Sequence, residues 1–421
     1  MPFSELGLCP ELLKAIAEAK YAIPTPVQAA AIPPILRAQD LQACAQTGSG
    51  KTAAFALPML QRLLNGATRG DRSTAEGIPG SASGATRGDR STVEGIPRSA
   101  SGATRGDRRV SGLVLVPTRE LATQVGEAFR SLARYLPQPI KVLTVFGGVS
   151  INPQMMALRG GADIVVATPG RLLDLADHNA VRLSDVSMLV LDEADRLLDE
   201  GFADELSRVL ALLPDRRQNL LFSATFPPAV QSLAELLLRN PVRVDVAAVP
   251  GTVPDIQQRA IVVDPERRTQ LLRYLIRHHS WERTLVFVAT KYATEHIARK
   301  LQRLGFAARA LHGDLSQGAR TQALADFKAG REQVLIATDV AARGIDVVDL
   351  AAVVNFDLPR STADYVHRIG RTGRAGASGV AVSFVSAAME AHFRLIEKRN
   401  RFRLEREKVR GFEPRKTTST P

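Results

Sequence analysis

Cysteine is scarce in this sequence, since Cys9 and Cys44 are the only two among 421 residues. Their separation matches neither a metal-ligand pair nor a redox motif. Two cysteines also cannot build the disulfide framework typical of small secreted domains. We therefore expect a reducing compartment, and a cytoplasmic location.

Long hydrophobic runs are also missing. No stretch of about 18 apolar residues occurs anywhere, so the sequence predicts no membrane span. Near the start, Glu5 and Glu11 interrupt the region where a secretory signal would need a continuous apolar segment. The hydrophobic content is nevertheless 45%, which is enough to fill the cores of two or three domains.

Acidic residues are outnumbered by basic ones, 43 to 55, which gives a net charge of +12. Such a balance favours a polyanionic partner, with nucleic acid first and an anionic membrane surface second. The charge is concentrated near the end, because residues 394 to 416 contain ten Lys or Arg and four Glu. We expect residues 394–421 to form a basic C-terminal tail whose affinity for nucleic acid falls with salt.

Short β-branched and leucine-rich runs alternate with stretches of helical periodicity along most of the chain, for example "GLVLV", "DIVVA", "QVLIA" and "GVAVSFV". This alternation predicts an α/β fold of mostly parallel sheets with helices on both faces. A segment rich in proline and glycine, residues 246–256, interrupts the pattern. We predict one domain over residues 1–245, a linker at 246–256 and a second domain over 257–393.

An 18-residue phrase is repeated within residues 66–109, where "GATRGDRST" occurs twice and its first half occurs a third time. The segment lacks helical or strand periodicity, and its units have almost no apolar residues to stack as a solenoid would. We predict a disordered, tandemly duplicated surface insertion in the first domain. Each copy contains Arg-Gly-Asp, as in cell-adhesion ligands, but a cytoplasmic location disfavours that role.

The segment "AQTGSGKT" follows a predicted strand and precedes a predicted helix. Backbone N–H groups in such a turn, with the helix N-terminus, cradle phosphates. Lys51 would reach the β- and γ-phosphates of ATP, and the Thr52 hydroxyl would ligate Mg²⁺. Ala45 stands where the general motif begins with glycine. The predicted nucleotide loop is Ala45, Gln46, Thr47, Gly48, Ser49, Gly50, Lys51 and Thr52.

The second motif is acidic. It is "VLDEAD", whose acidic residues follow another predicted strand that ends at Leu191. Asp192 is placed to bind Mg²⁺, and Glu193 is placed to position or deprotonate the attacking water. In parallel α/β sheets ligands bind at the carboxyl ends of the strands, where both motifs fall. The pair predicts nucleoside triphosphate hydrolysis.

With these two motifs, the order "PTPVQ", "PTRELA", "GG", "TPGR", "SAT", "QGAR", "ATDVAARGID" and "HRIGRTGR" resembles the DEAD-box ATP-dependent RNA helicases of superfamily 2. The resemblance covers nearly the whole chain outside the repeat. "LHGDLSQGARTQALADF" is most similar to the bacterial RhlE-type members. The resemblance implies two tandem RecA-like domains that close around ATP, Mg²⁺ and RNA.

The same resemblance implies roles for further residues. Gln28 would bind the adenine edge, Tyr21 would stack on the adenine with support from Phe3, and Asp346 would touch the ribose. Lys20 stands where the family commonly has glycine. Four residues would couple hydrolysis to strand separation, namely Asp195, Ser223, Thr225 and His367. Arg371 and Arg374 would reach the γ-phosphate from the second domain, which agrees with the absence of an arginine finger beside Lys51 and Asp192.

An RNA path is implied on both domains. In the first it would comprise Pro117, Thr118, Arg119, Gly147, Gly148, Thr168, Gly170 and Arg171. In the second it would comprise Gln317, Arg320 and Thr338. Backbone turns, threonine and arginine suit phosphate and 2′-OH contacts, so we expect binding without sequence specificity.

The predicted activity is ATP-dependent separation or remodelling of short RNA duplexes and RNA–protein complexes by a monomeric core. The resemblance implies single-stranded and duplex RNA as partners, such as ribosomal precursors or mRNA-decay complexes. Two alternatives stay open at this point. One is a DNA-directed helicase of the same superfamily, and the other is an ATP-gated RNA clamp with little unwinding.

Overall fold

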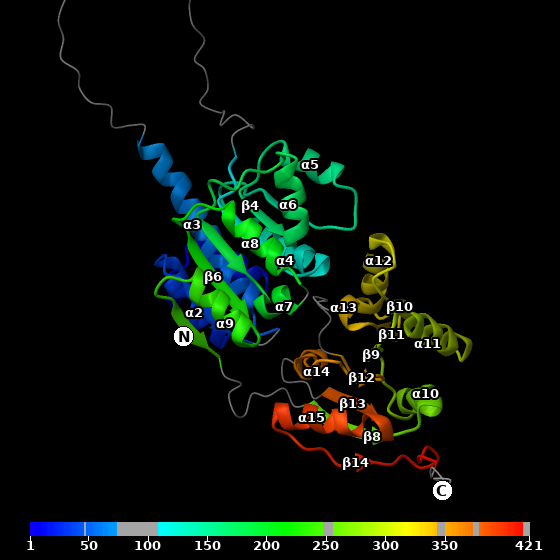
Figure 1. The fold of residues 1–421 in the computed structure, drawn as a ribbon. Helices are drawn as coiled ribbons and strands as arrows, with labels where there is room; N and C mark the ends of the chain where they lie inside the picture. The colour runs from blue at the N-terminus through cyan, green and yellow to red at the C-terminus, as the bar shows by residue number, and fades with distance from the viewer. Residues whose placement is uncertain are drawn as a thin grey trace, which may run out of the picture. The chain divides into compact units, whose positions relative to one another are not determined.

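The structure is a computed structural model that describes residues 1–45, 48–73, 108–199, 201–246, 256–342, 350–373 and 379–415, with the backbone alone for 67–73 and 363. The chain forms two units, which we describe separately. Unit 1 contains Met1–Ala45 and Ser49–Asp245, and unit 2 contains the residues from Val246 onward (Figure 1).

Unit 1 is built on a parallel seven-stranded sheet with the order β3-β4-β2-β5-β6-β1-β7. Its strands are short and mostly buried, as expected for a sheet covered on both faces. They are β1 (Leu41–Cys44), β2 (Gly112–Leu115), β3 (Val142–Val145), β4 (Ile164–Ala167), β5 (Met188–Leu191), β6 (Gln218–Ser223) and β7 (Val242–Asp245).

Two helical layers cover this sheet. One layer consists of α1 (Pro10–Glu18), α2 (Pro26–Leu36), α3 (Lys51–Ser73) and α4 (Arg119–Ala133). The other consists of α6 (Pro169–Asp177), α7 (Ala194–Asp199), α8 (Ala203–Ala211) and α9 (Pro228–Leu237), with α5 (Asn152–Leu158) at one end. Consecutive β6 residues point to opposite layers, because Phe222 contacts Phe55 of α3 while Leu221 joins the core beneath α6 to α9.

Unit 2 has a second parallel seven-stranded sheet, with the order β10-β11-β9-β12-β13-β8-β14. Numbered along the chain, this is the same order as in unit 1. Its strands are β8 (Ile256–Val262), β9 (Thr284–Phe287), β10 (Ala308–Leu311), β11 (Val334–Ala337), β12 (Ala352–Asn355), β13 (Gly379–Val385) and β14 (Arg406–Glu407).

Helices again cover both faces. On one face lie α10 (Arg268–His278) and α11 (Lys291–Arg303). On the other lie α12 (Gln317–Lys328), α13 (Asp339–Ala342), α14 (Thr362–Ile369) and α15 (Glu390–Asn400). Leu285 and Val286, neighbours on β9, belong to the two opposite cores. The predicted α/β fold of two parallel sheets with helices on both faces is therefore confirmed.

The ends of the predicted insertion belong to the fold of unit 1. Helix α3 continues to Ser73, beyond the predicted start of the insertion at residue 66. At the other end, Arg108 Nη1 lies 2.5 Å from Asp163 Oδ2, and Arg109 Nη1 lies 3.1 Å from Asp185 Oδ1. These ion pairs hold the chain where it enters β2. The prediction of disorder over residues 66–109 is therefore wrong for 66–73 and 108–109, and its remainder, residues 74–107, lies outside the described residues.

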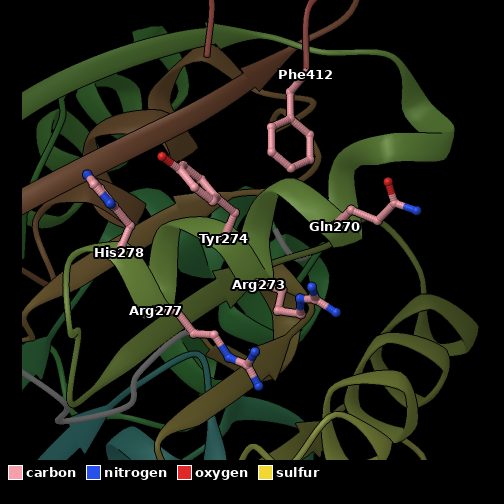
Figure 2. A pocket seen from close by; sticks show the side chains of 6 residues that line it. All are labelled: Gln270, Arg273, Tyr274, Arg277, His278 and Phe412. Atoms are coloured by element: carbon pink, nitrogen blue, oxygen red, sulfur yellow. The ribbon is translucent and has the colours of Figure 1, made fainter. Parts of the chain in front are cut away.

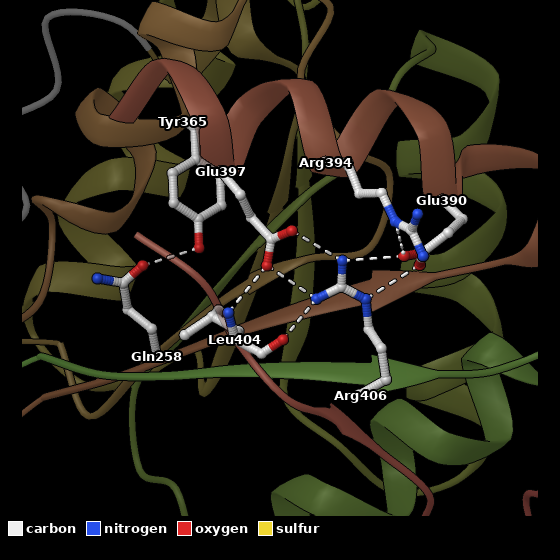
Figure 3. Close-up of polar contacts among 7 residues, drawn as sticks. All are labelled: Gln258, Tyr365, Glu390, Arg394, Glu397, Leu404 and Arg406. Carbon is white, nitrogen blue, oxygen red and sulfur yellow. Dashed lines mark hydrogen bonds and ion pairs between the residues drawn. The ribbon is translucent and has the colours of Figure 1, made fainter. Parts of the chain in front are cut away.

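The predicted basic tail is also part of unit 2 for most of its length. Residues 394–400 complete α15, and β14 extends the sheet by pairing with β8. Arg406 binds Glu397 and Glu390 at 2.9 and 3.0 Å (Figure 3). Its guanidinium also lies over the Phe393 ring. The boundary predicted at residue 393 is therefore too early, because the carboxylates of α15 bind the arginine that sequence composition assigned to a solvated tail.

None of the helices in the described residues is long and apolar enough to cross a bilayer.

Candidate nucleotide and nucleic-acid site

The strand order of unit 1 divides the predicted site residues into two groups along the carboxyl edge of its sheet. Strands β5, β6 and β1 are neighbours and carry the acidic motif, Ser223 and the glycine-rich loop. Strands β3, β4 and β2 are neighbours and carry the residues predicted to bind RNA. We call these groups the phosphate half and the arginine half of the edge.

The glycine-rich loop has the conformation that its glycines permit. Gly48 and Gly50 have φ of 81° and 90°, in the left-handed region that disfavours side chains. A Cβ on Gly50 would also lie 2.5 Å from Gln28 Nε2, so the backbone passes too close for a larger residue. Lys51 begins α3, is buried, and donates from Nζ to the Ala45 carbonyl at 2.9 Å. Thr52 follows on the first turn. Gln46 and Thr47 lie outside the described residues.

Gln28 ties helix α2 to this loop. Thr25 and Gln28 form a capping box, and Gln28 Nε2 also donates to the Gly50 carbonyl at 3.2 Å. The amide predicted to bind adenine is therefore buried and fixed against the loop. Tyr21 is 41% exposed, with its ring centroid 6.5 Å from that of buried Phe3. Phe3 thus lies where it can support the Tyr21 ring.

Lys20 has a φ of 59°, so it occupies the left-handed conformation at the end of α1. This explains the glycine common in the family at this place, because only glycine adopts the conformation without strain. The turn is retained although the residue differs.

The acidic motif lies directly after β5 and is buried, with Asp192 only 2% and Glu193 8% exposed. Asp192 Oδ1 accepts a hydrogen bond from the Glu193 N–H at 3.0 Å. Glu193 has a φ of 53°, an unusual conformation for a side chain of its size and one that is frequent at functional sites. Burial raises the pKa of Asp192 to about 6, while the cation of Lys51 opposes the rise and Glu193 and Asp195 add to it.

These residues fit a divalent cation. The Asp192 carboxylate and the Thr52 hydroxyl are the hard oxygen donors that Mg²⁺ prefers. Burial raises the pKa of Asp192, and a divalent cation beside the carboxylate would favour its charged form. Asp192 and Thr52 would hold the ion, whose chemistry is to neutralise charge on the phosphates.

The four residues predicted to couple the two activities are distributed between the units. In unit 1, Asp195 Oδ2 accepts from the Thr225 N–H at 3.0 Å and from its hydroxyl at 2.8 Å. The Asp195 N–H donates to Ser223 Oγ at 3.2 Å. The acidic motif is thus joined directly to the end of β6. His367 lies in α14 of unit 2.

The arginine half joins three loops. Helix α4 places the Arg119 guanidinium against Gly148, where an added Cβ would lie within 2.2 Å of Nη1. Arg171, on α6 and 9% exposed, donates from Nη2 to the Val149 carbonyl at 2.8 Å. Two arginines from different helices, Arg119 of α4 and Arg171 of α6, therefore pack against the "FGGVS" loop that follows β3.

The remaining predicted residues of this half lie at the same ends. Thr118 caps α4 by accepting from the Leu121 N–H at 3.2 Å, and the Thr168 N–H donates to the Val145 carbonyl at 3.1 Å. The other members are Pro117, Gly147 and Gly170. Gln154 was not predicted, yet it bonds to both backbone groups of Phe146 and to the Ser150 carbonyl. No motif marks Gln154, since its role depends on the way α5 folds back on the loop.

The predicted residues of unit 2 also lie after its strands. Gln317 begins α12 after β10, Arg320 is buried one turn later, and Thr338 follows β11. Arg371 follows α14 and is 8% exposed. Asp346 and Arg374 lie outside the described residues.

Arg368 is the first arginine of "HRIGRTGR", and its role is structural. It is 2% exposed and forms two hydrogen bonds with Asp339, at 2.6 and 2.7 Å. It also donates to Asn355 Oδ1 and lies over the Phe287 ring. Arg368 therefore fixes α14, and hence the start of the Arg371 segment, to the sheet.

Comparisons with known proteins agree with this geometry. The DEAD/DEAH box helicase family model matches residues 25–233, and the helicase conserved C-terminal domain model matches residues 266–376. The chain is 40% identical over 399 residues to the ATP-dependent RNA helicase DeaD of Mycobacterium tuberculosis, covering 95% of this chain and 63% of that protein. It is 36% identical over 404 residues to the DEAD-box ATP-dependent RNA helicase CshA of Bacillus cereus, covering 96% and 69%.

Among solved structures, S. cerevisiae Dbp5 bound to RNA and ADP BeF3 is similar, with a TM-score of 0.78 and 32% identity over 97% of this chain and 95% of that chain. The chain belongs to the DEAD-box family of ATP-dependent RNA helicases. Its two sheets are tandem RecA-like domains, as the sequence predicted.

Proposed function

We propose that this chain hydrolyses ATP with Mg²⁺ and uses the cycle to separate short RNA duplexes and remodel RNA–protein complexes. One observation carries the proposal, namely that a single sheet edge bears both a buried acidic phosphate half and an arginine half. The direct contact of Asp195 with Thr225 and Ser223 ties the acidic motif to the strand next to it. We further propose a monomeric, cytoplasmic enzyme of the RhlE type.

In the phosphate half, the loop N–H groups and Lys51 would bind the triphosphate, with Gln28 and Tyr21 at the adenine. Glu193 would orient and deprotonate the attacking water, because its backbone has an unusual conformation and its N–H donates to Asp192. From unit 2, Arg371 and Arg374 would bind the γ-phosphate when the units close, with Asp346 at the ribose. His367 would take part in this coupling.

In the arginine half, Arg119 and Arg171 would bind RNA phosphates together with the loop backbone. Arg171 supports this role because Nη1 is buried and has no hydrogen-bond partner among the described residues. An anion at this loop would complete its hydrogen bonds. Gln317, Arg320 and Thr338 would extend the path on unit 2. Backbone and phosphate contacts carry no base information, so binding without sequence specificity is expected.

Two variants of the phosphate half test the proposal. Lys51→Ala should lose ATP affinity, whereas Glu193→Gln should bind ATP and RNA but lower kcat by about 10²–10⁴, the range of a lost general base. The measurement is steady-state ATPase with and without RNA, beside nucleotide and RNA binding. Wild-type turnover in Glu193→Gln would contradict the assignment. Stimulation by DNA equal to that by RNA would favour the DNA-directed alternative, and single-turnover hydrolysis would favour the RNA clamp.

A further inference from the structure

A row of aromatic rings lies on the outer side of α10. Phe412, Tyr274, His278, His279 and Trp281 follow one another with ring centroids 5.6, 5.2, 4.9 and 5.2 Å apart. Tyr274 and His278 are stacked, with their planes 11° apart. Trp281 is buried and anchors the row, whereas Tyr274 is 39% exposed. The row therefore presents ring surface to solvent.

A cavity of about 490 Å³ opens beside this row, within the range of small-ligand pockets. Figure 2 shows the Phe412 ring reaching toward α10 from the C-terminal segment, between Tyr274 and Gln270. Arg267 holds that segment by donating to the Gly411 and Glu413 carbonyls, and its guanidinium lies over the Phe412 ring. The cavity is lined by Gln270, Arg273, Tyr274, Arg277, His278 and Phe412.

The charge around the cavity is mostly positive. Helix α10 contains no Asp or Glu, and Arg273 is exposed without a hydrogen-bond partner among the described residues. Arg277 donates to the Leu304 carbonyl and lies over the Phe306 ring. The nearest carboxylate on the C-terminal segment, Glu413, accepts from the Gly411 N–H. A ligand here meets guanidinium groups and flat rings together.

Ordinary helix stability does not account for this arrangement. A cation in the last turn is favoured by the helix dipole, which explains Arg277. It does not explain Arg273 in the middle of the helix, or a tyrosine left partly exposed. The partly exposed Tyr274 ring beside the Arg273 and Arg277 guanidinium groups suits base stacking, with the charge directed to phosphates.

We propose that Arg273, Tyr274, His278 and Phe412, the α10 platform, bind a single-stranded segment of RNA outside the helicase edge. An unpaired base would stack on the exposed rings, and its phosphates would lie against Arg273 and Arg277. This rests on RNA being the substrate of the proposed function. Arg277 contacts Leu304 and Phe306, which precede β10, whereas Gln317 and Thr338 follow the carboxyl ends of β10 and β11. Helix α12 also covers the opposite face. The platform is therefore a separate site that would retain the flanking strand of an RNA.

The test uses the full-length chain without nucleotide and a labelled single-stranded RNA of about 20 nucleotides, longer than the 4–16 that one site covers. Fluorescence anisotropy should show Tyr274→Ala binding about 5- to 100-fold more weakly, the range of one lost stacking contact. Tyr274→Phe keeps the ring and should bind like wild type. Arg273→Glu should weaken binding and lower its salt dependence. Ultraviolet crosslinking should attach the RNA to the peptides containing Tyr274 or Phe412.

Arg299→Glu on α11 is the matched control, since it makes the same charge change on an exposed helix of the same unit. Thermal unfolding verifies that each variant is folded. Equal affinity of folded Tyr274→Ala and wild type, with RNA-stimulated ATPase present in the wild type, would overturn the platform and leave the proposed function standing. A wild type without RNA stimulation would instead refute the proposed function. Loss of RNA binding on adding free AMP, or crosslinking of AMP alone to Tyr274, would overturn the proposal in favour of a mononucleotide site. Binding of an acidic peptide instead of RNA would overturn it also.

Discussion

The two units have the same strand order but differ at the place where unit 1 holds its phosphate loop. In unit 1, β1 leads through a glycine loop to Lys51, the first residue of α3, and β5 leads to Asp192. In unit 2, β8 leads through a loop without glycine to Arg268, the first residue of α10, and β12 leads to Asp357. Arg268 Nη1 and Asp357 Oδ1 lie 2.7 Å apart. A direct ion pair thus occupies the position that a phosphate loop occupies in unit 1.

The difference shows how one topology serves two purposes. Left-handed glycines keep backbone N–H groups available for an external anion in unit 1. In unit 2 the cation and the carboxylate satisfy each other, so the same end of the sheet has a structural role. We infer that unit 2 contributes to ATP hydrolysis only through residues elsewhere, above all Arg371.

The largest expected effect tests that contribution. Arg371→Ala should lower RNA-stimulated kcat by about 10³–10⁵, the range of a lost arginine finger, because charge developing on the γ-phosphate loses its partner. ATP affinity should change little, since Lys51 and the loop stay intact. Steady-state kinetics beside ATP titration make the measurement, and Arg360→Ala, an exposed arginine of unit 2, is the control. Normal turnover in Arg371→Ala would mean that unit 1 hydrolyses ATP alone.

The ion pair of unit 2 is expected to affect stability and not nucleotide binding. Arg268→Ala leaves Asp357 partly buried without its cation, so unit 2 should lose about 2–4 kcal/mol in urea unfolding. Arg309→Ala breaks the more exposed pair with Glu332 in the same sheet and should lose less than about 1 kcal/mol. A weakened ATP affinity in folded Arg268→Ala would show that the pair belongs to a nucleotide site.

Asp192 should lower the free energy of unfolding of unit 1 at neutral pH relative to its value near pH 4. Its pKa is raised from 3.8 to about 6, so between those values the folded state keeps a proton that the unfolded state has released. The free energy of unfolding therefore falls as pH rises through that window. The pKa difference corresponds to at most about 3 kcal/mol.

Asp192→Asn removes this titration. The variant should unfold at higher urea than wild type at pH 7 without Mg²⁺, with the gap closing toward pH 4, although it cannot support hydrolysis. The exposed Glu235→Gln on α9 should show no such gap. Parallel stability curves for Asp192→Asn and wild type would refute the assigned burial effect.

The smallest effect concerns the connection between α3 and β2. The equivalent connection in unit 2, from α10 to β9, is a short segment. The topology that the two units share therefore does not need an insertion between α3 and β2. Replacing residues 74–107 with a short Gly/Ser linker should leave ATPase turnover within about a few-fold, because loop length has a weak entropic effect. RNA affinity should fall modestly at low salt. Loss of activity in a folded deletion protein would show that the repeat belongs to the enzyme.

A longer deletion makes the same experiment more informative. Extending it through Arg109 also removes the ion pairs with Asp163 and Asp185. This variant should unfold at lower temperature than the 74–107 deletion, by an amount that Asp163→Asn reproduces in part.

The strands that are followed by a motif could be predicted from the sequence, because in each of them polar residues come directly after an apolar run. β7, β8 and β14 carry no such signal and were not predicted. The glycine loop and the acidic motif could also be predicted, because the residue types and spacing within each motif are those that phosphate and Mg²⁺ binding require. By contrast, the Arg268–Asp357 pair and the contact of Tyr274 with Phe412 join residues far apart in the chain. Only the folded packing brings them together. Arg406 was misread because composition cannot reveal that Glu390 and Glu397 of α15 lie beside it in the folded chain.

The pairing of β14 with β8 has a practical consequence for anyone shortening the chain. Arg406 and Glu407 pair with Ala260 and Ile261 and cover one border of the second sheet. A version that stops at Asn400 would leave the backbone groups of Ala260 and Ile261 without this partner strand. Open strand borders recruit strands from other molecules. Such a shortened protein would self-associate, so its solution behaviour would report exposed β8 and not the enzyme's own assembly.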